Sequence, residues 1–283
     1  MTGKLIKYEF RSGLRYIGII WAALIVSAIL LGVVLKVMST IFPENPQGAL
    51  NILELIFELV FPLLYGAIFI AMIVITVFIV LMRFYKGLLG DEGYLMHTLP
   101  VKPWQLITSK GIVAGAVVVI SIICAVISIL ILVGINDMNG LLSVSKDFFE
   151  VLGDEPRLIL VMIEAVILMV VGVIKGIYQI YAAMSIGQLA DKHRLLTSLG
   201  AYIGISVVLT MLASALFVIV DLTCLDVWFT DWLMSIEPSI GINDDGFILV
   251  QAGMAAILIV LAVQVAAFHI VSERILSKKL NLI

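Results

Sequence analysis

Residues 60–82 read VFPLLYGAIFIAMIVITVFIVLM, and none of them carries a charge. A helix that crosses a membrane needs about 20 predominantly apolar residues, so this stretch is long enough to do so. The chain contains six such runs, at about 16–38, 60–82, 111–135, 158–181, 199–220 and 247–271. With 63% hydrophobic and 13% charged residues among 283, the composition is that of an integral membrane protein. The sequence therefore predicts an all-α fold with six transmembrane helices, because a helix satisfies its own backbone hydrogen bonds in lipid.

Basic residues divide unevenly between the two ends of these predicted spans. Thirteen Lys and Arg residues fall on the side of the termini, and three fall on the opposite side. Connections rich in Lys and Arg stay in the cytoplasm, so we expect both termini to be cytoplasmic in a bacterial cell membrane. Residues 221–246 show the opposite bias, with six acids and no Lys or Arg. The net charge of −3 thus conceals two oppositely charged faces and gives no reason to expect a nucleic acid partner.

Two segments outside the spans are expected to lie along the membrane surface. Residues 1–15 combine basic and apolar side chains, which indicates either an amphipathic cytoplasmic arm or a simple positive anchor. In the extracellular segment 221–246, Trp228 and Trp232 alternate with acids, which favours a short outer interfacial helix over an exposed loop. Residues 136–157 are interpreted as an acidic outer loop.

Several kinds of chemistry have no motif in this chain. The largest hydrophilic piece is under thirty residues long, too short for a nucleotide-binding domain, and no phosphate-binding glycine loop occurs. Cys124 and Cys224 belong to no metal-binding or redox pattern, and the three histidines have no nucleophile or ligand at a useful spacing. We therefore expect no enzyme activity, metal or cofactor in this chain, which is predicted to form a single transmembrane domain over residues 1–283.

The connection at 83–110 is the longest on the basic side, and it reads RFYKGLLGDEGYLMHTLPVKPWQLITSK. Asp91 and Glu92 stand where acids cap and stabilise the start of a helix. Apolar residues follow at helical spacing, Pro100 ends the pattern, and Pro103 suits the first turn of the next helix. The pattern predicts a short, stiff helix able to bind a groove on a cytoplasmic partner.

This connection resembles the corresponding loop of type-2 ABC transporter permeases, the membrane subunits of bacterial ABC exporters. The resemblance rests on the pattern D-E-G-Y-L-x-x-x-L-P at 91–100, on the following VKPWQL at 101–106 and on Ser109-Lys110. It also rests on the plan of the whole chain, which has a basic arm, six spans and this loop between spans two and three.

The resemblance implies a subunit that works with a second permease copy, in a homodimer or with a paralogue, and with two cytoplasmic ATPase subunits. ATP and Mg would bind to those partners, and transport would be outward, of a peptide, antimicrobial or lipid-like substrate. The loop would supply a coupling helix that docks on the ATPase, and small outer helices would lie between spans five and six. The implied docking segment contains Asp91, Glu92, Gly93, Tyr94, Leu95, His97, Leu99 and Pro100.

Glu164 is the acid that the sequence places inside a predicted span. Insertion of a charged carboxylate at the membrane centre costs roughly 2.5–3.5 kcal/mol, and such residues usually face a bundle interior or a cavity. Glu164 is thus either a point on a substrate path or a partly hydrated carboxylate near the outer interface. Lys175 shares its helix face but lies roughly 16 Å away along the axis, too far for a direct bond.

Two rival functions follow from the same residues. A proton-coupled secondary transporter would use Glu164, although the sequence contains no pair of interrupted spans in matching halves. A non-transporting membrane scaffold would bind a partner that lacks ATPase motifs. The run Asp191–Arg194 is interpreted either as a second ATPase contact or as a solvated basic turn. Membrane lipid surrounds the chain in every case.

Overall fold

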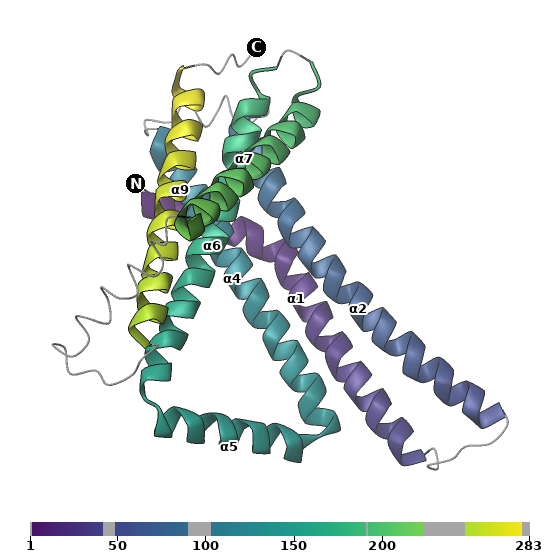
Figure 1. The fold of residues 1–283 in the computed structure, drawn as a ribbon. Helices are drawn as coiled ribbons and strands as arrows, with labels where there is room; N and C mark the ends of the chain where they lie inside the picture. Colours follow the sequence, from purple (N-terminus) through teal and green to yellow (C-terminus); the bar gives the residue numbers. More distant parts are fainter. Residues whose placement is uncertain (1, 42–48, 90–102, 191, 223–246, 279–283) are drawn as a thin grey trace. The chain divides into compact units, whose positions relative to one another are not determined.

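The computed structural model describes residues 2–41, 49–89, 103–190, 192–222 and 247–278, and its ribbon is drawn in Figure 1. These residues are almost entirely helical, and no strand occurs among them. The elements are α1 (Thr2–Ile41), α2 (Ala49–Phe84), η1 (Tyr85–Leu89), α4 (Pro103–Asn136), α5 (Met138–Asp154), α6 (Arg157–Gly187), α7 (Arg194–Leu222) and α9 (Phe247–Lys278).

Six of these helices are long and apolar enough to cross a membrane, counted over the described residues alone. They are α1, α2, α4, α6, α7 and α9, in agreement with the six runs expected from hydropathy. The helices extend past the apolar runs at several ends; α2, for example, passes through Pro62 and spans 36 residues. At 1.5 Å per residue α2 is about 54 Å long, which exceeds a hydrocarbon core of about 30 Å and requires tilt or projection beyond the lipid.

The chain forms two compact units, which are described separately. The first contains residues 1–83 and 112–159, and within it α1, α2 and most of α4 pack side by side. The Trp21 indole of α1 donates a 2.9 Å hydrogen bond to Ser121 Oγ of α4, and the Tyr65 hydroxyl of α2 lies 2.9 Å from Ser128 Oγ. The Lys36 ammonium of α1 also donates a 3.1 Å hydrogen bond to the Asn136 carbonyl oxygen of α4. These hydrogen bonds join α1, α2 and α4, so they help to set the register of the packing.

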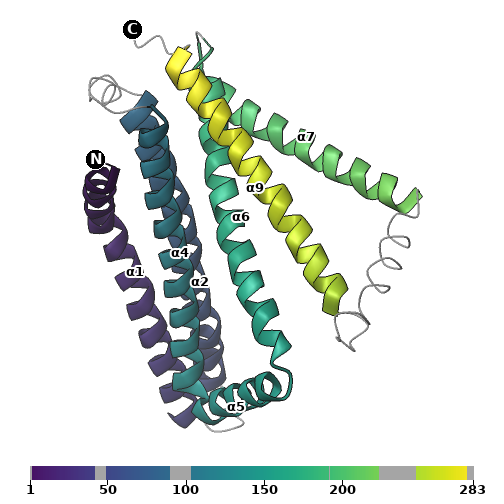
Figure 2. The ribbon, with the colours of Figure 1, turned by 90° about the vertical axis from the view of Figure 1, so that its left-hand side faces the viewer.

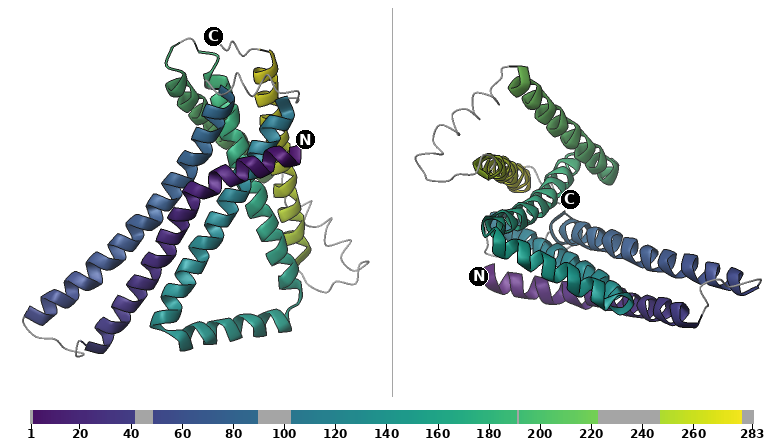
Figure 3. Two further views of the ribbon diagram at one scale, coloured as in Figure 1. Left: turned by 180° about the vertical axis from the view of Figure 1, so that it is seen from behind. Right: turned by 60° about the horizontal axis from the view of Figure 1, so that its bottom comes forward.

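The predicted N-terminal arm is continuous with the first span, because α1 is one helix from Thr2 onward. Figure 3 shows its N-terminal part bending away from the direction of the rest, and this part includes Ser12-Gly13, a pair of the kind at which helices kink. Glu9 forms a 2.8 Å ion pair with Arg83 near the end of α2. The arm is therefore held against the first unit, while its position on the membrane surface stays a prediction.

The expected acidic loop at 136–157 is wrong, because most of it is the helix α5. Asp137 caps its start by accepting a 2.8 Å hydrogen bond from the Gly140 amide, and Pro156 separates its end from α6. The apolar side chains recur at helical spacing, which the acids between them obscured. These side chains belong to Met138, Leu141, Leu142, Phe148, Phe149 and Leu152.

The second unit contains residues 84–111 and 160–283. Within it α6 and α9 run in the same direction, and α7 diverges from α6 after the turn that joins them (Figure 2). Gly187 at the end of α6 lies against Ser198 of α7, and His193 in the turn adopts a left-handed φ of 58°. The Gln179 side chain of α6 donates a 2.8 Å hydrogen bond to Ser206 Oγ of α7.

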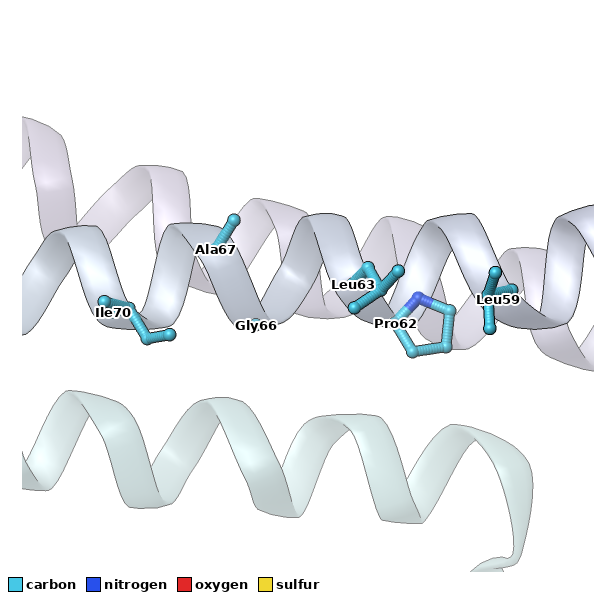
Figure 4. Close-up of a pocket in the computed structure, with 6 residues that line it drawn as sticks. All are labelled: Leu59, Pro62, Leu63, Gly66, Ala67 and Ile70. Carbon is cyan, nitrogen blue, oxygen red and sulfur yellow. The ribbon is translucent and has the colours of Figure 1, made fainter.

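One side of α2 forms an open apolar groove (Figure 4). The groove is lined by Leu59, Pro62, Leu63, Gly66, Ala67 and Ile70. This spacing places every lining residue on one helix face, and Leu59, Leu63 and Ile70 are largely exposed. Exposed aliphatic side chains along a spanning helix are the ordinary surface of a membrane protein toward lipid, so the groove alone marks no functional site.

Candidate functional site: the cluster that anchors the 90–102 connection

The expected docking residues lie outside the described residues. These are Asp91, Glu92, Gly93, Tyr94, Leu95, His97, Leu99 and Pro100. The helix predicted for them, and their contact with an ATPase, therefore stay predictions. The structure does describe both flanks of the 90–102 segment, and these flanks carry the site's geometry.

Before the segment, the chain leaves α2 through the π-helical turn η1, in which Leu88 and Leu89 are buried. After the segment, α4 begins at Pro103, as the sequence predicted. Pro suits this first position because its missing N–H would have had no partner inside the helix. Both flanks belong to the second unit, together with α6 and α9, although the remainder of α2 and α4 belongs to the first.

An aromatic cluster holds the first flank to α6. The Phe84 ring stacks on the Tyr181 ring with 3.8 Å between centroids and 13° between planes, and both side chains are almost fully buried. Tyr178 meets Tyr181 edge-on at 5.9 Å and meets His269 of α9 edge-on at 5.4 Å. Phe84, Tyr178, Tyr181 and His269 are called the Tyr178 cluster below. Aromatic pairs of this kind contribute roughly 0.5–1.5 kcal/mol beyond the area they bury.

The second flank reaches the same cluster through Gly111 of α4. Gly111 approaches Tyr178 so closely that a β-carbon there would lie 2.6 Å from the tyrosine hydroxyl oxygen. Lys110, only 6% exposed, packs its ammonium group against Gly87 of η1. Both ends of the 90–102 segment are therefore fixed to each other and to α6 and α9.

This cluster was not anticipated from the sequence. Tyr178 and Tyr181 are three residues apart, which places both rings on one helix face, but the same spacing is common in any helix core. Nothing local indicates that Phe84, nearly one hundred residues earlier, stacks on one of them. The G-x-x-x-G pair at 111 and 115 was a usable signal, because glycine permits the close approach that Tyr178 makes.

The arrangement holds the four rings of the cluster in fixed positions relative to one another. Rings packed with little free volume resist independent movement, because displacement of one ring removes many van der Waals contacts at once. A force applied to the 90–102 segment would consequently reach α6 through Phe84 and Tyr181, and α9 through Tyr178 and His269.

Glu164 lies apart from this cluster. It is fourteen residues before Tyr178 on the same helix, a separation of about 21 Å at 1.5 Å per residue. Its side chain is half-buried, and its Oε2 atom is buried without a hydrogen-bond partner among the described residues. A buried carboxylate oxygen without a partner is costly, so this position favours a polar partner from outside the described chain.

Two further G-x-x-x-G pairs occur in the described helices, at 172 and 176 in α6 and at 200 and 204 in α7. A β-carbon at Gly172, Gly176, Gly200 or Gly204 would meet nothing within 4 Å in the part of the chain that the structure describes. Within the described part of a single chain, no other helix therefore packs closely against these positions on α6 and α7. Lys192 and His193 are exposed in the turn before α7, Arg194 is exposed at its first position, and Asp191 lies outside the described residues. Both interpretations of this run therefore stay predictions.

The fold defines this chain as a helical protein with six membrane-spanning candidates among its described residues. Comparison with protein-family models, with curated proteins and with solved structures finds no match. The likeness to ABC permeases therefore rests on the loop pattern and the order of the spans.

Proposed function

We propose that this chain is the membrane subunit of an ATP-driven exporter of the type-2 ABC class. It would work with a second copy of itself and with two cytoplasmic ATPase subunits that hold ATP and Mg. Residues 91–100 would dock on the ATPase. The proposed substrate class is a peptide, an antimicrobial or a lipid-like molecule that moves outward.

The observation that carries this proposal is the anchoring of both flanks of the 90–102 segment. A segment that merely connects two spans has no need of a buried aromatic stack and a buried lysine at its ends. A segment that transmits force does need them, because a loose connection would absorb a partner's movement. The resemblance of residues 91–106 to a coupling helix supplies the identity of the partner.

The first experiment isolates the tagged chain from its native membrane and identifies the proteins that co-purify. The proposal expects a stoichiometric cytoplasmic ATPase and vanadate-sensitive ATP hydrolysis by the complex. Recovery of folded chain with a partner that lacks ATPase motifs would favour the scaffold instead, and recovery of folded chain alone would favour the secondary transporter.

Docking is tested by charged substitutions in the segment. Leu95→Asp and Leu99→Asp should each lower ATPase recovery at least tenfold, because a buried charge at a docking surface is poorly tolerated. Ser277→Asp is the control, since it adds the same charge at an exposed position at the end of α9. Wild-type ATPase recovery with both leucine variants would refute docking at residues 91–100.

One observation favours the rival secondary transporter. The Oε2 atom of Glu164 is buried and has no hydrogen-bond partner among the described residues. Proton coupling requires a side chain that gains and loses a proton. A glutamine side chain has nearly the same size as glutamate but cannot do so. In proteoliposomes, transport by wild type and any transport that remains in Glu164→Gln should both require ATP if the ABC proposal holds. Transport driven by a pH gradient without nucleotide, and abolished by Glu164→Gln, would replace the ABC proposal with the proton-coupled one.

A further inference from the structure

The helix α5 has two faces of different chemistry. Viewed down its axis, the apolar side chains cover about half of the circumference. They are Met138, Leu141, Leu142, Val144, Phe148, Phe149, Val151 and Leu152. The opposite half holds the polar side chains Asn139, Ser143, Lys146, Asp147, Glu150 and Asp154. No residue of α5 is buried, so this apolar half is not covered by the described chain.

The apolar half faces the side on which α4 lies. A β-carbon built on Gly134, in the last turn of α4, would be 3.3 Å from Leu141 Cδ2 and 3.7 Å from Met138 Cε. These two apolar side chains therefore fold back over the end of α4, and the polar half of α5 points away from it. Because α4 is a membrane-spanning candidate, the side of α5 nearest to α4 is the side nearest to the lipid.

The direction of α5 agrees with this placement. Figures 1 and 2 show it crossing the end of α4 at a steep angle rather than continuing along it. A helix that runs across the end of a span lies near the plane of the membrane surface. Six spans place α5, between the third and the fourth, on the side opposite to the two termini.

We propose that α5 is an interfacial helix whose apolar half is buried in the lipid headgroup region on the side opposite to the termini. Such helices enter the boundary between headgroups and acyl chains by about 5–10 Å. Phe149, 69% exposed, and Val144, 65% exposed, are inserted in the lipid, while Asp147 and Glu150 contact water. The partner is thus a lipid surface, and this assignment does not depend on the proposed transport function.

The length of α5 gives the assignment a structural consequence. Seventeen residues at 1.5 Å each hold the end of α4 and the start of α6 about 25 Å apart. A helix anchored in the headgroups keeps that spacing in the plane of the membrane and fixes the depth at which α6 begins. The alternative occupant of the apolar half is a second copy of this chain, which the experiment distinguishes from lipid.

The test uses the full-length chain, with Cys124 and Cys224 replaced by Ala, in phosphatidylcholine vesicles. Nitroxide labels are attached to single cysteines at Val144→Cys, Phe149→Cys, Asp147→Cys and Glu150→Cys. Collision with oxygen, which concentrates in lipid, is compared with collision with a water-soluble nickel chelate. Because α5 contributes no buried residue, these substitutions leave the packed parts of the chain intact, and size-exclusion chromatography checks each variant.

The proposal expects oxygen collisions to exceed nickel collisions at 144 and 149, and the order to reverse at 147 and 150. Nickel-dominated collisions at all four positions would mean that α5 is solvated, which overturns the proposal. Exclusion of both reagents at 144 and 149, with short label-to-label distances between chains, would show that a second copy covers this face and would overturn it equally.

Discussion

Whether a glycine in one helix touches a second helix depends on the residue that lies opposite it. Gly111 faces the Tyr178 hydroxyl and ring, whereas Gly172 faces open space in the described chain. Both are glycines within G-x-x-x-G pairs in apolar helices, so their local sequence does not separate them. The difference arises from the position of Tyr178 on α6.

At this scale we predict that Gly111→Ala destabilises the protein. The added carbon would lie 2.6 Å from Tyr178 Oη and 2.9 Å from Cζ, and the ring is held by Tyr181 and His269. Overpacking of this kind costs about 1–3 kcal/mol. Thermal unfolding in detergent, followed by tryptophan fluorescence, should show a lower Tm for Gly111→Ala and an unchanged or higher Tm for Gly172→Ala. Equal Tm values for wild type and Gly111→Ala would mean that Tyr178 moves aside freely.

At the scale of elements, the Tyr178 cluster links the end of α2 to α6 and α9 in the second unit, and Gly111 of α4 lies against its Tyr178. The stack of Phe84 on Tyr181 is a contact between the last residue of α2 and the C-terminal part of α6. Buried serines accompany it, and Ser185 and Ser272 each donate a hydrogen bond to a carbonyl of their own helix, so their burial leaves no hydroxyl unsatisfied.

We predict that the ring at position 181 matters more for coupling than for folding. Tyr181→Phe keeps the stack on Phe84, whereas Tyr181→Leu removes it and retains an apolar side chain of moderate size. In the proposed complex with an ATPase, Tyr181→Leu should lower the ratio of substrate transported to ATP hydrolysed by about fivefold, and Tyr181→Phe should stay within twofold of wild type. An unchanged ratio in Tyr181→Leu, with intact ATPase binding, would show that the stack does not transmit force and would leave docking itself unaffected.

For the whole molecule, charge distribution and span number together predict which side each connection occupies. Lys192 precedes α7 and Arg194 begins it, while three of the four charged side chains on the polar half of α5 are acidic. Because basic connections are retained in the cytoplasm, Lys192 should lie inside and Asp147 outside.

This orientation is checked with a maleimide that does not cross membranes, applied to intact cells. Both positions are exposed, so a cysteine at either one is accessible to reagent in its own compartment. With Cys124 and Cys224 replaced by Ala, Asp147→Cys should react at once and Lys192→Cys only after permeabilisation. The reverse order would invert the topology, and immediate reaction at both positions would contradict an odd number of spans between them.

The six apolar helices were predicted correctly from the sequence, whereas α5 was not. The spans were located because hydrophobic runs of about 20 residues are local features that lipid selects directly. The acids at 136–157 suggest a loop, but the helical spacing of Met138, Leu141, Leu142 and Phe149 indicates the helix that the structure shows. This spacing is a local feature, so α5 is also predictable from the sequence.

Six apolar runs long enough to cross a membrane, their approximate ends and the start of α4 at Pro103 could all be predicted from the sequence and are confirmed. Each of these depends on residues that are adjacent in the chain, since insertion into lipid and helix initiation are local processes. Only the tertiary structure decided that Phe84 stacks on Tyr181, that Gly111 meets Tyr178, and that the flanks of residues 90–102 are anchored to α6 and α9. Such contacts join residues far apart in sequence, and lipid gives apolar faces no preference among partners, so shape complementarity chooses between them.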